Sequence, residues 1–150
     1  MPSSKSVWLC VIALVVIVAG VYLLKPQSVL APVEETAVAT PTNPNLPIVT
    51  ITMDDNGFSP NEVIIKAGQK VEWINKSSRD FWPASNIHPT HSLYPDSSIF
   101  KCLTPDEPTI FDSCRPVTSG KSYSFTFGYK GEWRYHDHLR ANKTGVVLVK

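Results

Sequence analysis

The sequence reads SYSFTFGYKGEWRYHDHLRANKTGVVLVK over residues 122–150, and its aromatic residues recur at every second position. Three of them, beginning with Tyr123, share one face of the first strand that this period predicts. Trp133 and Tyr135 do the same in the next strand, and the aliphatic run at 145–150 predicts a closing strand. This alternation is typical of a sheet with one face packed on a hydrophobic core.

The same period extends upstream to residue 48. Runs rich in β-branched residues cover 48–53, 62–66 and 70–75, and turn residues separate them. Several short strands at close spacing predict an all-β sandwich or barrel. The expected domain therefore covers residues 48–150, a length that suits one domain.

A long stretch at 76–120 interrupts the strands. It is crowded with Pro, Ser and Asp, it has no period, and it exceeds ordinary loop lengths, which predicts a functional or disordered loop. Cys102 and Cys114 lie within it, and in an oxidising compartment they are expected to form a disulfide. The alternative is that one or both are thiolate ligands.

All four histidines fall into two short windows, with His88 and His91 in the long loop and His136 and His138 at a strand end. Positions i and i+2 of a strand share a face, and a tight turn around a proline can aim the other pair at the same point. Imidazole suits copper, zinc, nickel and iron, and the Irving–Williams order favours Cu(II). We therefore expect the four histidines to bind one copper ion. The alternative is a metal-free sandwich in which the two windows lie apart.

Residues 7–24 form an uncharged apolar run long enough to cross a hydrocarbon core of ~30 Å as a helix. This run predicts a single-pass anchor in the cell membrane, preceded by a short cytoplasmic tail at 1–6. A Pro- and Thr-rich tether at 25–47 follows, and the domain is expected to be periplasmic or extracellular. A cleaved signal peptide is the alternative, because Lys5 precedes the run and an Ala-Val-Ala sequence occurs at 37–39.

Charge and motifs exclude several classes of function. The formal net charge is +1 and the chain has no basic run, so nucleic acid is not an expected partner. The sequence shows no nucleophile motif, no phosphate-binding glycine loop and no HExxH helix, so hydrolysis has no support.

The beginning and the end of the domain resemble the cupredoxin (blue-copper) family. GFSP at 57–60 and KAGQKVEWIN at 66–75 are similar to its early strands, and GEWRYHDH at 131–138, followed by GVV at 145–147, is similar to its ligand-bearing hairpin. The resemblance covers roughly residues 48–150. It implies a cupredoxin-like Greek-key β-sandwich that binds copper.

The sequence departs from this family at the metal ligands. Aligned on Gly131, the cysteine of the blue-copper site corresponds to Asp137, and Met53 lies in an early strand. A trigonal site of two histidines and a cysteine with an axial methionine therefore cannot form at the usual place. The expected centre is a histidine-only, non-blue site in which Asp137 either orients an imidazole or acts as a spare ligand.

The histidine motifs also resemble those of multicopper oxidases. By that analogy His91, His136 and His138 would bind one ion while His88 pointed toward Asp137. We prefer a single four-histidine site, because one domain lacks the further ligands of a trinuclear cluster.

The cupredoxin resemblance implies electron transfer with a redox or copper-exchange protein partner rather than an enzyme. The alternatives are copper storage, delivery or sensing, and a small copper oxidoreductase similar to superoxide dismutase. Trp82 lies close to the histidine loop and is either an ordinary core residue or a screen between metal and solvent.

Overall fold

In a computed structural model, the chain is described from residue 39 to residue 150. The strands are β1 (Val49–Asp54), β2 (Gly57–Ser59), β3 (Glu62–Ile65), β4 (Gln69–Asn75), β5 (Pro83–Ser85), β6 (Ser122–Phe127), β7 (Gly131–Asp137) and β8 (Arg140–Val149), with the 3-10 helices η1 (Ile99–Lys101) and η2 (Glu107–Thr109) between β5 and β6. No helix in this part of the chain is long and apolar enough to cross a membrane. The predicted cytoplasmic tail, membrane helix and first part of the tether lie outside the described residues.

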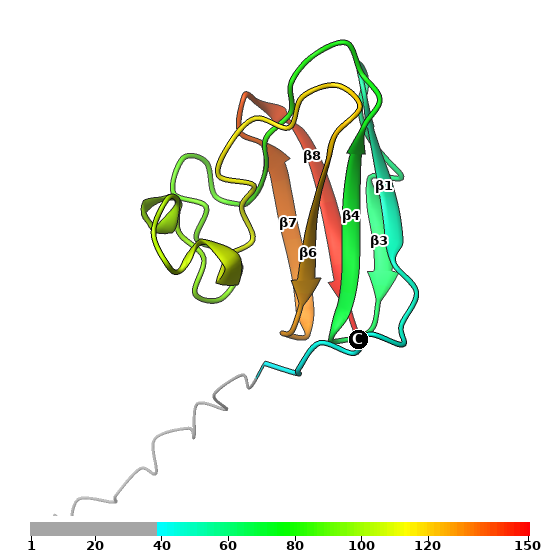
Figure 1. Ribbon diagram of the computed structural model, residues 1–150, viewed down its shortest axis with the longest axis vertical. Helices are drawn as coiled ribbons and strands as arrows, with labels where there is room; N and C mark the ends of the chain where they lie inside the picture. The colour runs from blue at the N-terminus through cyan, green and yellow to red at the C-terminus, as the bar shows by residue number, and fades with distance from the viewer. Residues whose placement is uncertain (1–38) are drawn as a thin grey trace, which may run out of the picture. The chain divides into compact units, whose positions relative to one another are not determined.

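The strands form two four-stranded sheets, in the orders β2-β1-β4-β6 and β3-β8-β7-β5 (Figure 1). β1 runs parallel to β4 and β3 runs parallel to β8, whereas the other pairs are antiparallel. Each parallel pair joins strands that are not consecutive in the chain. The expected all-β architecture is confirmed for the described residues.

The alternating side chains meet in one core between the two sheets. Trp73 of β4 is fully buried and lies at 5.3–6.3 Å, between ring centroids, from four other aromatic rings, those of Phe111, Tyr123, Phe127 and Tyr135. Aromatic pairs of this kind each add about 0.5–1.5 kcal/mol beyond the area they bury. Because Tyr135 belongs to β7, this packing fixes the position of the strand that carries His136.

The stretch at 76–120 is folded against the sheets. β5 pairs with β7, and isolated bridges join Phe81 to Val117 and Ala84 to Asp112. The predicted disulfide between Cys102 and Cys114 is confirmed. In Figure 1 the two 3-10 helices of this stretch lie to the left of β7, outside the sheets. The loop is thereby held beside the end of β7.

Some boundaries differ from those that the sequence predicts. β2 and β5 have three residues each, too few to show a period, and β8 begins at Arg140 rather than at residue 145 because its polar first half pairs with the end of β7. The last part of the predicted tether packs on the domain, since Thr40 N–H donates to Gly128 O at 2.7 Å and Asn43 N–H donates to Gly68 O at 3.1 Å.

Candidate metal centre

The end of β7 presents two histidines to the long loop. The pleat sends Tyr135 into the core, so His136 points to the opposite face of the strand. His138 follows the last residue of β7, and its N–H donates to Trp82 O at 2.7 Å. Both imidazoles therefore face the turn that contains the other two histidines, as the i, i+2 spacing predicts.

The other two histidines come from a turn that is tied to β7. Asn86 N–H donates to Arg134 O at 3.0 Å, and His91 N–H closes the turn on Ile87 O at 2.7 Å. His91 has a φ of 56°, in the left-handed region that non-glycine residues rarely occupy. Backbone conformations of this kind cluster at functional sites, where the surrounding structure holds them in place.

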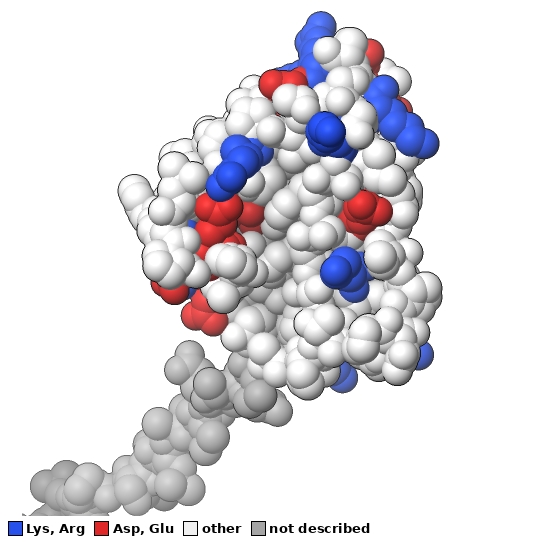
Figure 2. All heavy atoms as spheres, viewed as in Figure 1, with Lys and Arg blue, Asp and Glu red and all other residues white. Residues whose placement is uncertain are grey.

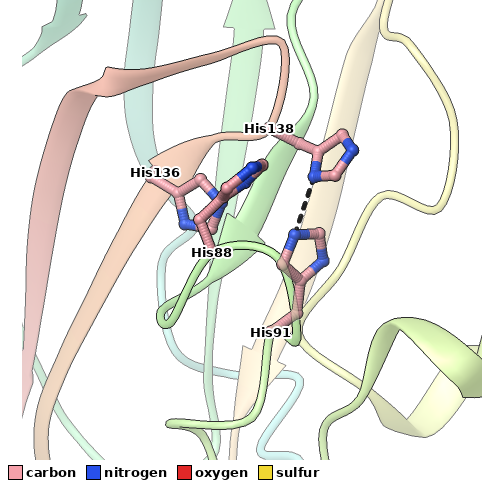
Figure 3. A group of neighbouring side chains, drawn as sticks. All are labelled: His88, His91, His136 and His138. Atoms are coloured by element: carbon pink, nitrogen blue, oxygen red, sulfur yellow. Dashed lines mark hydrogen bonds between the residues drawn. The ribbon is translucent and has the colours of Figure 1, made fainter.

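The four imidazoles converge on one point (Figure 3). Each offers one ring nitrogen, and these four atoms all lie within 4.8 Å of one another. His88 Nδ1 is 3.3 Å from His136 Nε2, and His91 Nε2 is 2.9 Å from His138 Nδ1. The structure thus brings together both windows.

The rings alternate between the two windows around this point. Neighbouring ring centroids, each pairing one loop histidine with one strand-end histidine, are 4.8–5.3 Å apart. The two diagonals are longer, at 6.4 Å between His88 and His91 and 6.5 Å between His136 and His138. In a regular tetrahedron all six centroid distances would be equal. In a planar square the two diagonals would exceed the four sides by more than they do here. The four ring centroids therefore form a flattened tetrahedron.

Two of the four histidines are buried, and we call them the inner histidines. His91 and His136 are 0% and 1% exposed, whereas His88 is exposed. Burial, followed by the charges of His91, His88 and His138, lowers the pKa of His136 to about 4, and burial also lowers the pKa of His138. A neutral imidazole has a free lone pair, which is the form that binds a metal.

Two polar side chains support the inner histidines from behind. His91 Nδ1 lies 2.5 Å from Asp112 Oδ2, and His136 Nδ1 lies 2.9 Å from Asn86 Oδ1. Hydrogen bonds of this kind orient the imidazoles of metal centres and leave the other ring nitrogen free as a ligand. Sequence reasoning missed both residues, since neither has a recognisable spacing to the histidine that it contacts.

Trp82 closes one side of the cluster. Its ring centroid is 4.6 Å from that of His138, and its Nε1–H donates to Asp112 Oδ1 at 2.6 Å. The Trp82 side chain thus packs beside the cluster and is only partly buried, and its interpretation as a screen stays a prediction.

Asp137 lies on the other face of β7, away from the imidazoles. Its Oδ1 accepts from Trp82 N–H at 2.9 Å and Leu139 N–H at 3.1 Å, and its Oδ2 accepts from Arg140 Nε at 2.8 Å. The strand alternation that aligns His136 with His138 turns the residue between them away. Asp137 is not one of the clustered donors, and His88 faces His136 rather than Asp137. This geometry therefore does not favour Asp137 as an alternative ligand.

The cysteines belong to a separate group. Cys102 and Cys114 are joined to each other, so neither offers a thiolate to the histidines. The four-histidine cluster contains no cysteine.

Comparisons of the sequence find no matching family model and no significant match among curated proteins. Comparison of the structure does find similar folds. A purple cupredoxin from Nitrosopumilus maritimus matches with a TM-score of 0.52 and 18% identity, over 68% of this chain and 99% of that one. Amicyanin from Paracoccus versutus matches with a TM-score of 0.51 and 18% identity, over 73% and 90% of the two chains. The described part of this chain therefore has a cupredoxin-like fold.

Proposed function

We propose that this chain binds one copper ion through His88, His91, His136 and His138 and acts as an electron-transfer protein. The observation that carries the proposal is the convergence of four ring nitrogens within 4.8 Å of one another. Protonated imidazoles repel one another, so four histidines on a β-sandwich are not expected to converge unless they share a ligand. A metal ion supplies the positive charge that four lone pairs can share.

The donor set fits copper. Four imidazoles without a thiolate are a donor set that suits Cu(II). Copper bound there would supply a one-electron couple. The protein would supply rigidity, because Asp112 and Asn86 hold two of the ligands from behind and Trp82 packs against a third. Such restraint of the ligands would favour electron transfer over catalysis, because it would limit their movement between oxidation states.

The place of action that we propose is the outer side of the cell membrane. The apolar run at 7–24 supports a membrane anchor, and the disulfide supports an oxidising compartment. The partner in this scheme is a redox or copper-exchange protein that meets the domain on that side.

Copper storage, delivery or sensing is the second candidate, and one observation favours it. His88 is exposed, so a competing ligand from solvent or from another protein can reach it without unfolding the domain. A ligand that can be displaced first gives copper a route out of the site. Electron transfer and delivery therefore differ in how quickly the site exchanges its metal.

The test is to load the full-length protein with Cu(II), reduce it, and reoxidise it in the presence of a Cu(I) chelator. Electron transfer predicts that copper stays bound through the cycle and that the electron paramagnetic resonance spectrum returns unchanged. Rapid loss of reduced copper to the chelator favours delivery instead.

Two variants serve as references. His136→Ala removes a buried ligand and is expected to abolish stoichiometric binding. Glu132→Gln alters an exposed side chain at the opposite end of β7 and is expected to bind copper as the unmodified protein does. Equal copper binding by both variants would show that the cluster is not the site.

A further inference from the structure

Asp112 is the most heavily engaged side chain behind the histidine cluster. It lies between η2 and β6, and only 3% of it is exposed. Its Oδ2 faces His91 Nδ1 at 2.5 Å, and its Oδ1 accepts from Trp82 Nε1–H at 2.6 Å and from Cys114 N–H at 2.7 Å. All three neighbours of the carboxylate are nitrogens, and the indole and the amide can only donate.

The consequence for His91 is a fixed tautomer. A carboxylate only accepts hydrogen bonds, so His91 must carry its proton on Nδ1 where it meets Oδ2. His91 Nε2 is then left with its lone pair, and this is the atom that lies 2.9 Å from His138 Nδ1 in the centre of the cluster. Because His91 is fully buried, water cannot take the place of this partner.

His136 has a less selective support. Its Nδ1 faces the side-chain amide of Asn86, which can present either its oxygen or its nitrogen by rotating. Asn86 can therefore accept from or donate to the imidazole. Only Asp112 restricts its histidine to one tautomer.

Asp112 also reaches a second histidine indirectly. The Trp82 ring that it holds through Nε1 packs on His138, with ring centroids 4.6 Å apart. One buried carboxylate is thus in contact with His91 and with the side chain that packs on His138.

We infer that Asp112 is a positioning residue that selects the Nδ1–H tautomer of His91 and so makes His91 Nε2 available as a copper ligand. This inference rests on the proposed copper site, but the tautomer is a property of the metal-free protein. Control of the His91 tautomer distinguishes Asp112 from a residue that only stabilises the loop.

Two substitutions separate these roles. D112N keeps the shape and one oxygen. If that oxygen continues to accept from Trp82 and Cys114, the new NH2 group faces His91 Nδ1, which must then accept and move its proton to Nε2. D112A removes more contacts but leaves His91 free to take either tautomer.

The expected order of copper binding is therefore unmodified protein, then D112A, then D112N. Loss of a partner behind a metal-ligating histidine usually weakens metal affinity about 10- to 100-fold, and we expect D112A near the lower and D112N near the upper limit. A purely structural role predicts the reverse order, because alanine removes all three hydrogen bonds.

The experiment has two arms, both on the full chain. Long-range 1H–15N correlation spectra of the metal-free proteins give the tautomer of His91, and Cu(II) titration followed by electron paramagnetic resonance gives affinity and the number of nitrogen ligands. We expect Nδ1–H in the unmodified protein, Nε2–H in D112N, and one nitrogen fewer in the copper spectrum of D112N.

An Nε2–H tautomer in the unmodified protein would overturn the inference, and that spectrum needs no variant to fold. A D112N protein that binds copper as tightly as D112A would overturn it too. Absence of copper binding by the unmodified protein, with the Nδ1–H tautomer present, would instead contradict the proposed function.

Discussion

Acidification is expected to destabilise the metal-free protein, because His136 resists protonation in the folded state. Burial, and then the charges on His91, His88 and His138, lower its pKa from 6.5 to about 4. In the unfolded chain the same imidazole takes up a proton near the usual value of about 6.5. Between these two values the unfolded state binds more protons, so the free energy of unfolding falls as the pH falls.

The size of the effect follows from the difference between the two pKa values. At about 1.4 kcal/mol per pKa unit, a change from 6.5 to about 4 corresponds to about 3 kcal/mol. The folded protein has this stability in full above the unfolded pKa and loses it progressively as the pH approaches the folded pKa. This change in the free energy of unfolding can be measured by urea unfolding of the metal-free protein at a series of pH values from neutral downward, with tryptophan fluorescence as the signal.

The His136→Asn variant isolates this contribution from that of the carboxylates. It lacks the titrating imidazole, so the fall in its free energy of unfolding over the same pH range is expected to be about 3 kcal/mol smaller than that of the unmodified protein. Parallel curves for the two proteins would refute the reasoning, since they would show that His136 takes up its proton equally well in both states.

Three further predictions concern the scaffold and use the same urea assay. Arg140→Ala leaves the buried Asp137 carboxylate without its ion-pair partner and is expected to destabilise the protein by about 3 kcal/mol; a change below 1 kcal/mol, as for an exposed pair, would contradict this. Gly145→Ala places a methyl group against the Tyr135 ring and is expected to destabilise by about 2 kcal/mol, and an unchanged midpoint would show that the ring can move aside. Reduction of the disulfide, which spans 12 residues, is expected to lower stability by roughly 3 kcal/mol and to weaken copper binding, because Cys114 N–H helps to hold Asp112; unchanged copper affinity would show that this amide does not matter to the site.

Much of the fold could be predicted from alternation alone. The runs at 62–66, 70–75 and 122–127 became β3, β4 and β6 within a residue or so, because each places apolar side chains on one face at a period of two. The three-residue strands β2 and β5 could not be found in this way. They depend on partners elsewhere in the chain rather than on a local pattern.

The histidines of the site were predictable because histidine is rare in this chain and falls in two windows. Their supports were not. Asp112 meets His91 across 21 residues of a stretch without periodicity, and the contact exists only because the loop folds beside β7. Asp137 was the more obvious carboxylate by its place in the sequence, yet the pleat of β7 turns it away from its two neighbours.

On the face drawn in Figure 2, lysine and arginine side chains are interspersed with aspartate and glutamate, so the surface there provides no strong field of one sign. Side-chain contacts with Asp112 and Asn86 are what orient His91 and His136.

The measurement that tests the central claim most directly is titration of the full-length protein with Cu(II), followed by optical and electron paramagnetic resonance spectra. The four-histidine site predicts one tightly bound equivalent, weak visible absorption and hyperfine structure from nitrogen ligands, all lost in His136→Ala. An intense charge-transfer band would show a thiolate ligand and contradict the disulfide. Absence of stoichiometric binding would contradict the copper site itself.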